Sequence, residues 1–165
     1  MRAIVVYESH WGNTAAVARA IAEGFGPGAK ALSTAEATQA AVASADLIVA
    51  GAPLMGFRLP TERTLKDLGA KAGKNRVAPD LSLPALRSWL EALPQANGRS
   101  AAFETRLRLS PGGAAKAIAR RLEKAGYAPV AKPQRFFVKG TYGPLRDGEL
   151  ERAKAWGAEL SKAMK

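Results

Sequence analysis

Cysteine is absent from the 165 residues, and histidine occurs once, as His10. Without cysteine the chain can form no disulfide, no thiolate zinc site and no cysteine-ligated iron–sulfur cluster, and it has no cysteine nucleophile. The single histidine argues against a histidine-rich metal site. A Ser-His-Asp triad could be built only on His10.

Long apolar runs are also missing. No stretch approaches the roughly 18 apolar residues that a membrane-spanning helix needs. The first seven residues lack the apolar segment and the small-residue cleavage site of a signal peptide. We therefore expect no membrane span and a cytoplasmic protein. Hydrophobic residues make up 47% and charged residues 24% of the chain, which is typical of a globular protein, and the length predicts one domain over residues 1–165.

Acidic residues are scarce relative to basic ones. Lys and Arg number 25 against 14 Asp and Glu, a formal net charge of +11. Residues 1–57 hold three basic and four acidic side chains, so the excess lies in residues 58–165. Either a solvated basic surface or contact with nucleic acid or an anionic membrane would explain it. Single-strand binding needs exposed aromatic side chains, whereas Phe103, Phe136 and Phe137 fall in expected strands, which favours the solvated surface.

Short apolar runs alternate with stretches of helical periodicity along the chain. We expect strands at 3–7, 30–33, 46–51, 99–104 and 135–139, and helices at 15–25, 34–44, 82–93, 114–125 and 147–164. Ser82 is the expected N-cap of the third helix. Strands and helices that alternate in this way predict a parallel sheet with helical crossovers. Residues 54–81 are long for a connector and form either a functional loop or lid or a mobile segment, with a loose helix over 61–71.

The first strand leads through a polar loop, Ser9 to Thr14, directly into a helix. Backbone N–H groups and two hydroxyls at a helix N-terminus favour an anion, above all phosphate. Gly12 permits a tight turn. The same pattern also fits a simple capping turn. No lysine follows the glycine, so this is neither a nucleotide-hydrolase P-loop nor a Gly-x-Gly-x-x-Gly motif.

The segment from Val5 to Thr14 resembles the phosphate loop of flavodoxins, in the variant with an aromatic residue before Gly-Asn-Thr. Residues 46–53, Asp-Leu-Ile-Val-Ala-Gly-Ala-Pro, are similar to the family's third strand and second flavin loop. Phe103 to Arg106 and the stretch from Phe136 to Leu145 look like a flavodoxin-family subgroup of high-GC Gram-positive bacteria. The resemblance implies an α/β three-layer sandwich whose five-stranded parallel sheet has the order 2-1-3-4-5, with FMN at the carboxyl ends of strands 1, 3 and 4.

The resemblance also implies which residues would bind FMN. The phosphate would lie in the first loop, the flavin ring against the second loop, and the pyrimidine edge near the end of the fourth strand. The residues concerned are Ser9, His10, Trp11, Gly12, Asn13, Thr14, Pro53, Leu54, Met55, Gly56, Phe57, Glu104, Thr105 and Arg106. The chain departs from the family in having no aromatic residue between 105 and 113, in having Leu54 where Thr or Ser often follows the proline, and in its positive charge.

For three of the five side chains below, a functional and a structural interpretation are both open, and for two we expect a structural role. A phosphate dianion would raise the pKa of His10, unless His10 is simply exposed in its loop. Arg106 would raise the reduction potential of a bound flavin, unless it is an ordinary surface arginine. Trp11 would contact either the ligand or its own loop. Trp89 and Trp156 fall on apolar helical stripes and are expected in the core.

The leading functional hypothesis is an FMN flavoprotein that transfers electrons, as a shuttle for a redox partner protein or as a reductase of a small acceptor. The alternative is a flavodoxin-fold binding or regulatory module that has lost FMN. A third hypothesis, nonspecific nucleic-acid binding, rests on charge alone. The oligomeric state is open.

Overall fold

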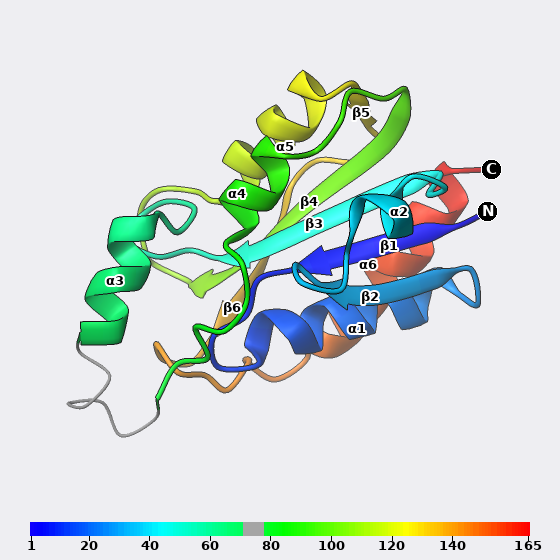
Figure 1. Cartoon of the computed structure of the whole chain (residues 1–165). Helices are drawn as coiled ribbons and strands as arrows, with labels where there is room; N and C mark the ends of the chain where they lie inside the picture. The colour runs from blue at the N-terminus through cyan, green and yellow to red at the C-terminus, as the bar shows by residue number, and fades with distance from the viewer. Residues whose placement is uncertain (71–77) are drawn as a thin grey trace.

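The computed structural model describes residues 1–70 and 78–165, in the architecture of Figure 1. Its elements, in chain order, are β1 (Ala3–Tyr7), α1 (Asn13–Phe25), β2 (Ala29–Ser33), α2 (Gln39–Val42), β3 (Leu47–Pro53), α3 (Glu62–Ala70), α4 (Leu86–Glu91), β4 (Gly98–Leu107), α5 (Ala115–Lys124), β5 (Tyr127–Pro129), β6 (Gln134–Val138) and α6 (Glu149–Ala163). The described part contains no helix long and apolar enough to cross a membrane.

The strands form one parallel sheet in the order β2-β1-β3-β4-β5, which confirms the predicted topology. β6 also pairs with β4. β5 lies opposite residues 98–100 and β6 opposite residues 103–107 of β4. The fifth position of the sheet is thus an interrupted strand, with Pro129 and Pro133 on either side of the break. Proline cannot donate to a strand ladder, which explains the interruption that we did not expect.

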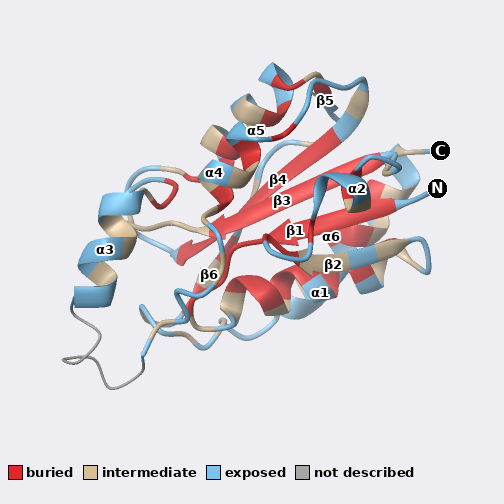
Figure 2. Cartoon of the chain, viewed as in Figure 1, coloured by how far each residue is buried: buried red, intermediate tan, exposed pale blue. Residues whose placement is uncertain are grey.

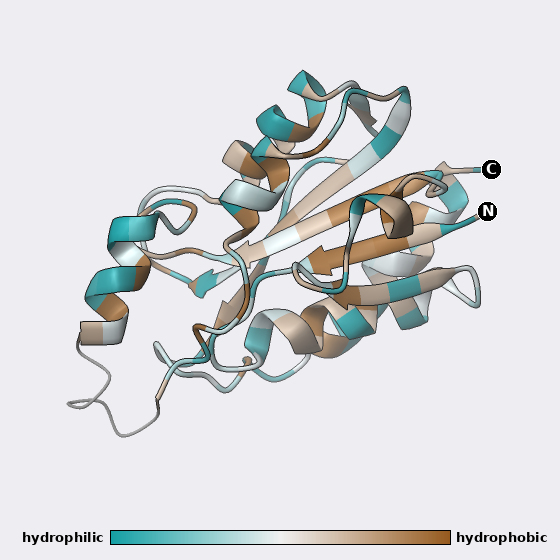
Figure 3. Ribbon diagram, in the orientation of Figure 1, coloured by the Kyte–Doolittle hydropathy of each residue, from teal (hydrophilic) through white to brown (hydrophobic). Residues whose placement is uncertain are grey.

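Helices cover both faces of the sheet, so the fold has three layers (Figure 1). Alternate residues of β1 and β3 point to opposite faces, and both sets are buried. α1 and α6 pack on one face, and α4 and α5 pack on the other. Strands buried on both faces need continuous apolar runs. Figure 2 shows this burial along β1, β3 and β4, and Figure 3 shows the hydrophobic residues of β1 and β3.

Two glycines bring α1 and α6 into backbone contact. A Cβ at Gly157 would lie 2.1 Å from the carbonyl oxygen of Ile21, and a Cβ at Gly24 would lie 1.8 Å from that of Lys154. Only glycine permits such an approach. The position of Gly157 inside the last predicted helix indicates close packing, which the structure confirms. Trp156, one residue earlier, is buried as expected, whereas Trp89 is half-buried at the edge of the other core.

Three predicted helices differ from the structure in their length or their buried face. The helix predicted at 34–44 is reduced to Gln39–Val42, because the Thr38 hydroxyl accepts from Ala41 N–H and caps a later start. The helix predicted at 82–93 begins only at Leu86. Ser82 is not its N-cap, since its N–H and hydroxyl donate to the Asp80 carboxylate. In the helix predicted at 147–164, the spacing of Leu150 with Ala153 and Leu160 predicts a buried position, but Leu150 is 43% exposed.

Two further elements bear on the site. β4 continues to Leu107, three residues beyond the strand predicted at 99–104. α3 confirms the helix predicted within residues 54–81. The expected order or mobility of that whole segment lies partly outside the described residues, because positions 71–77 are not described.

Candidate functional site

A cavity of about 470 Å³ opens at the carboxyl ends of the central strands. Its walls come from the turn after β1, the loop after β3, the end of β4, α3 and the segment after β6. The lining residues are Ser9, His10, Trp11, Asn13, Thr14, Pro53, Leu54, Met55, Gly56, Phe57, Thr64, Asp67, Leu68, Thr105, Arg106, Leu107, Ser110, Val138 and Thr141. They include twelve of the fourteen residues proposed from the sequence.

Gly12 and Glu104 do not line this cavity. Gly12 lies in the turn, with a left-handed φ of 89°. Glu104 is buried, and its Oε2 accepts from Ala114 N–H at 3.0 Å. Its Oε1 lies 3.6 Å from both Arg106 Nη1 and Arg135 Nε. The structure therefore places Glu104 where it holds the start of α5.

The turn after β1 is tied at several points. Ser9 Oγ accepts from Ala15 N–H at 3.2 Å, and the Thr14 and Thr105 hydroxyls are 2.8 Å apart. Asn13 Nδ2 donates to the Tyr142 carbonyl at 3.2 Å, which joins the turn to the segment after β6. The first N–H groups of a helix have no acceptor within it. In α1 the first of these are the N–H groups of Asn13 and Thr14, and the helix dipole at this end also favours an anion.

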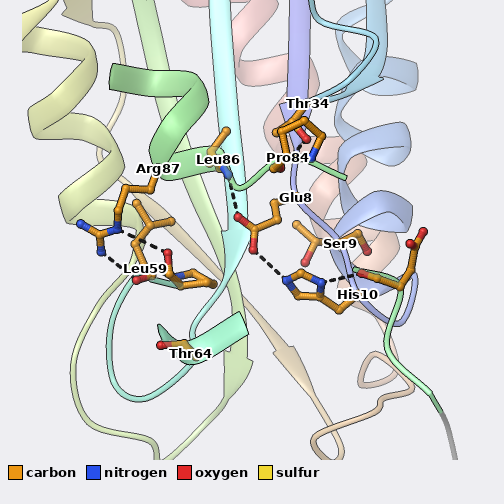
Figure 4. A network of polar contacts seen from close by, with 12 residues as sticks. Glu8, Ser9, His10, Thr34, Leu59, Thr64, Pro84, Leu86 and Arg87 are labelled. Carbon is orange, nitrogen blue, oxygen red and sulfur yellow. Dashed lines mark hydrogen bonds and ion pairs between the residues drawn. The ribbon is translucent and has the colours of Figure 1, made fainter. Parts of the chain in front are cut away.

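His10 is 5% exposed, so the alternative of an exposed loop histidine is wrong. Its Nε2 lies 2.7 Å from Glu8 Oε2 and its Nδ1 lies 2.8 Å from the Asp80 carbonyl oxygen (Figure 4). Burial alone lowers the pKa of His10, but the hydrogen bonds to Glu8 and Asp80 and their negative charge outweigh it and raise the pKa above 6.5. Glu8 was not among the residues proposed from the sequence. Its signal was a lone carboxylate directly after a buried apolar strand.

The loop after β3 forms a tight turn at the cavity edge. Met55 and Arg58 exchange two backbone hydrogen bonds, of 2.9 and 3.2 Å. Gly56 and Phe57 between them have φ of 56° and 65°, as a type I′ turn requires. Left-handed backbone is costly for a bulky residue such as Phe57, and strain of this kind is concentrated at functional sites. The turn leaves the Phe57 ring 64% exposed beside the cavity.

Arg106 is 5% exposed, so its alternative as a surface arginine is wrong. Its Nη1 donates to the Gly112 carbonyl at 2.9 Å and its Nε to the Leu107 carbonyl at 3.3 Å. The side chain therefore shapes the loop after β4 and leaves a buried cation at the cavity wall. A Cβ at Gly112 would lie 2.0 Å from the Phe57 carbonyl oxygen, so this loop packs against the turn after β3.

Trp11 lines the cavity and also packs within its own surroundings, so both of its expected roles are compatible with the structure. Its ring meets that of Tyr142 edge-on, with centroids 5.1 Å apart. Of the seven lining residues that the sequence did not suggest, three come from α3. Thr64 and Leu68 are four residues apart on this helix, and that spacing was the available signal.

Comparison with solved structures identifies the fold. A flavodoxin from the domain Archaea superposes with a TM-score of 0.67 at 22% identity, covering 99% of both chains. A WrbA-like flavodoxin from Agrobacterium tumefaciens gives 0.65 at 20% identity over 99% of this chain and 96% of that one. The flavodiiron core from Synechocystis sp. PCC6803 gives 0.66 at 19% identity, over 99% of this chain and 36% of that one.

No family model and no curated protein matches the sequence. At these identities the likeness to solved structures establishes the fold, which is flavodoxin-like.

Proposed function

We propose that the protein binds FMN in the cavity at the carboxyl ends of β1, β3 and β4 and transfers electrons through it. The observation that carries the proposal is the turn from Ser9 to Thr14, which opens α1 at the wall of that cavity. The similar solved structures include proteins described as flavodoxins in oxidised and in two-electron reduced form. Bound FMN supplies the capacity to accept and release electrons.

The residues present fit the phosphate end of such a cofactor. The N–H groups of Asn13 and Thr14 would donate to phosphate oxygens. Ser9 Oγ accepts one hydrogen bond and so keeps its own O–H for donation. The Thr14 and Thr105 hydroxyls share one proton between them and keep the other as a donor.

The rest of the cavity fits the ring. A volume of about 470 Å³ lies within the range of roughly 300–1,000 Å³ that is usual for cofactor pockets. The loop from 105 to 113 supplies no aromatic side chain, but Leu54, Met55 and Phe57 line one wall and Trp11 another. These side chains would shield the ring from water. A redox partner protein or a small electron acceptor would then complete the electron transfer.

The decisive experiment compares FMN with riboflavin, which has the same ring and no phosphate. We expect saturable quenching of FMN fluorescence on titration with the protein, at least about tenfold tighter than for riboflavin, because a hydrogen bond to a charged group contributes about 1.5–3 kcal/mol. Absence of quenching at about 10 µM FMN would overturn the proposal and favour a binding module without a flavin. Equal affinity for both ligands would show that the turn does not bind the phosphate.

Arg106 offers a second test, on the reduction potential. Reduction adds negative charge to a bound flavin, and a nearby cation stabilises that charge. We expect Arg106→Gln to lower the two-electron midpoint potential of bound FMN by about 30 mV, which corresponds to about 1.4 kcal/mol. Arg108→Gln, two residues later on an exposed side chain, is the control. Equal shifts in both variants, measured by potentiometry, would refute a specific effect of Arg106.

A further inference from the structure

The buried carboxylate of Glu8 joins three separate parts of the chain (Figure 4). Glu8 follows β1 and is 0% exposed. Its Oε2 contacts His10 Nε2 at 2.7 Å, and its Oε1 accepts from Leu86 N–H, also at 2.7 Å. Through these two oxygens the end of β1, the turn after it and the start of α4 are held together.

His10 in turn forms two hydrogen bonds with the backbone of Asp80. Its ring Nδ1 lies 2.8 Å from the Asp80 carbonyl oxygen, and its own carbonyl oxygen accepts from Asp80 N–H at 2.7 Å. The other end of the turn is tied to α1 by Ser9 Oγ and Ala15 N–H. The conformation of the turn therefore depends on the position of the His10 ring.

This arrangement requires a proton. A carbonyl oxygen only accepts, so Nδ1 must carry hydrogen and donate to Asp80. An ionised carboxylate also only accepts, so Nε2 must donate to Glu8 as well. An imidazole that donates from both nitrogens is the protonated cation. Loss of the Nε2 proton would leave a lone pair facing the carboxylate, and the ring would be repelled from Glu8.

The charges around the pair come from several elements. The Asp80 carboxylate, which accepts from Ser82, adds negative charge from the segment before α4. The Arg87 guanidinium on α4 donates to the Leu59 carbonyl at 2.8 Å and adds positive charge near Glu8. Arg106 on β4 and Asp67 on α3 line the same cavity as His10 and carry opposite charges. These fixed charges are of both signs. The Glu8 carboxylate, 2.7 Å from the His10 ring, opposes the lowering of the His10 pKa by burial.

We propose that Glu8 is a positioning residue that acts through protonated His10 to hold the turn from Ser9 to Thr14 in its ligand-binding conformation. The pair is a proton-dependent clamp between this turn and the segment from Asp80 to Leu86. Its effect on phosphate affinity rests on the proposed function, whereas the clamp itself does not. Glu8 lies directly before the polar turn, at the end of the apolar strand β1.

The sign of the pH dependence follows from the geometry and agrees with the raised pKa of His10. A group whose pKa is higher in the folded state stabilises the fold fully below its unfolded value of 6.5, and this stabilisation is lost as the pH rises through the folded value. Each pH unit in that window changes the folding equilibrium constant by up to about tenfold.

The test exploits the single histidine, whose imidazole signals in an NMR pH titration need no assignment. In the unmodified chain we expect His10 to titrate above 6.5. In Glu8→Gln the amide can accept from Leu86 with its oxygen and donate to a neutral Nε2 with its nitrogen. We therefore expect the His10 pKa to fall below 6.5 in that variant. Similar His10 titrations in the two proteins would overturn the proposal.

The pH dependence of protein stability and of FMN affinity also tests whether Glu8 positions the turn. As the pH rises above 6.5 we expect the free energy of unfolding of the unmodified chain to decrease, whereas Glu8→Gln should lose stability only as the pH falls below 6.5. FMN affinity should decrease with rising pH more steeply in the unmodified chain than in Glu8→Gln, by about tenfold across the window.

Glu23→Gln, which removes an exposed carboxylate paired with Lys154, is the matched control and should follow the unmodified chain. Parallel stability profiles for the unmodified chain and Glu8→Gln would refute the clamp.

Two precautions keep the outcomes distinct. If the chain binds no FMN, the proposed function fails while the NMR and unfolding profiles still decide on the clamp. If Glu8→Gln does not fold, the pH dependence of amide hydrogen exchange in the unmodified chain is measured in place of this variant. Protection factors of Asp80 and Leu86 N–H should then fall by about tenfold or more as His10 loses its proton, and unchanged protection would overturn the proposal.

Discussion

Replacing Thr14 with valine is expected to weaken FMN binding by about 10- to 100-fold. Valine keeps the shape of threonine and removes its hydroxyl, which lies in the first turn of α1 beside the cavity. A hydrogen bond to a charged group contributes about 1.5–3 kcal/mol, which gives that range. Thr14 is 2% exposed and also contacts the Thr105 hydroxyl at 2.8 Å, so the variant should in addition lose about 1 kcal/mol of stability.

Fluorescence titrations with FMN and riboflavin separate these two consequences. The affinity for riboflavin, which has no phosphate, should change less than about threefold, because the lost hydroxyl would face the phosphate. Thr34→Val is the matched control: Thr34 is buried and donates to the Pro84 carbonyl at 2.6 Å, but it does not line the cavity. If Thr14→Val lowered the affinity for FMN and for riboflavin equally, Thr14 would act only through the structure of the turn.

Gly157→Ala is expected to lower the free energy of unfolding by about 2 kcal/mol. In most helices this exchange is favourable, by up to about 1 kcal/mol. Here the new methyl group would lie 2.1 Å from the Ile21 carbonyl oxygen, so α1 and α6 must move apart. Inserting carbon into a packed interface costs about 1–3 kcal/mol, and more when backbone must shift. The thermal midpoint should fall by about 4–8 °C for a chain of this size.

The matched control is Gly69→Ala on the exposed α3, where the methyl group would meet only the flexible tip of Leu81 at 3.2 Å. Its stability should change by less than about 1 kcal/mol. Gly24→Ala should resemble Gly157→Ala, and the double variant should cost less than the sum, because separated helices accept the second methyl group more easily. If chemical denaturation showed that the two losses in unfolding free energy simply add, the two glycines would not act on one shared contact between α1 and α6.

Local sequence patterns predicted most of the sheet. Continuous apolar runs fitted β1 and β3 because both faces of a central parallel strand are buried. The helix predicted at 15–25 fitted α1 because its apolar residues recur at helical spacing and are buried. The predicted length of short helices such as α2 was too great. An Ala-rich stretch has a high helix propensity along its whole length, and only the Thr38 cap decides where the helix starts.

The candidate site was predictable wherever its residues are contiguous. The turn after β1 and the loop after β3 each lie in one stretch of sequence, and both line the cavity. Burial of Arg106 could not be predicted, because it depends on the carbonyl groups of a loop that follows it. The same holds for α3: the spacing of Thr64 and Leu68 places them on one face of the helix, but it does not show that this face covers a cavity.

The sequence by itself determined the alternation of strands and helices, the place of the polar turn at the start of α1 and the absence of cysteine chemistry. Each of these depends on residue type and short-range spacing. The tertiary structure alone decided which groups meet across long separations: Thr14 with Thr105, and Glu8 and His10 with the segment from Asp80 to Leu86. Parallel crossovers bring the carboxyl ends of distant strands to one edge of the sheet. A buried carboxylate or imidazole therefore acquires its partners, and its protonation, only when the chain has folded.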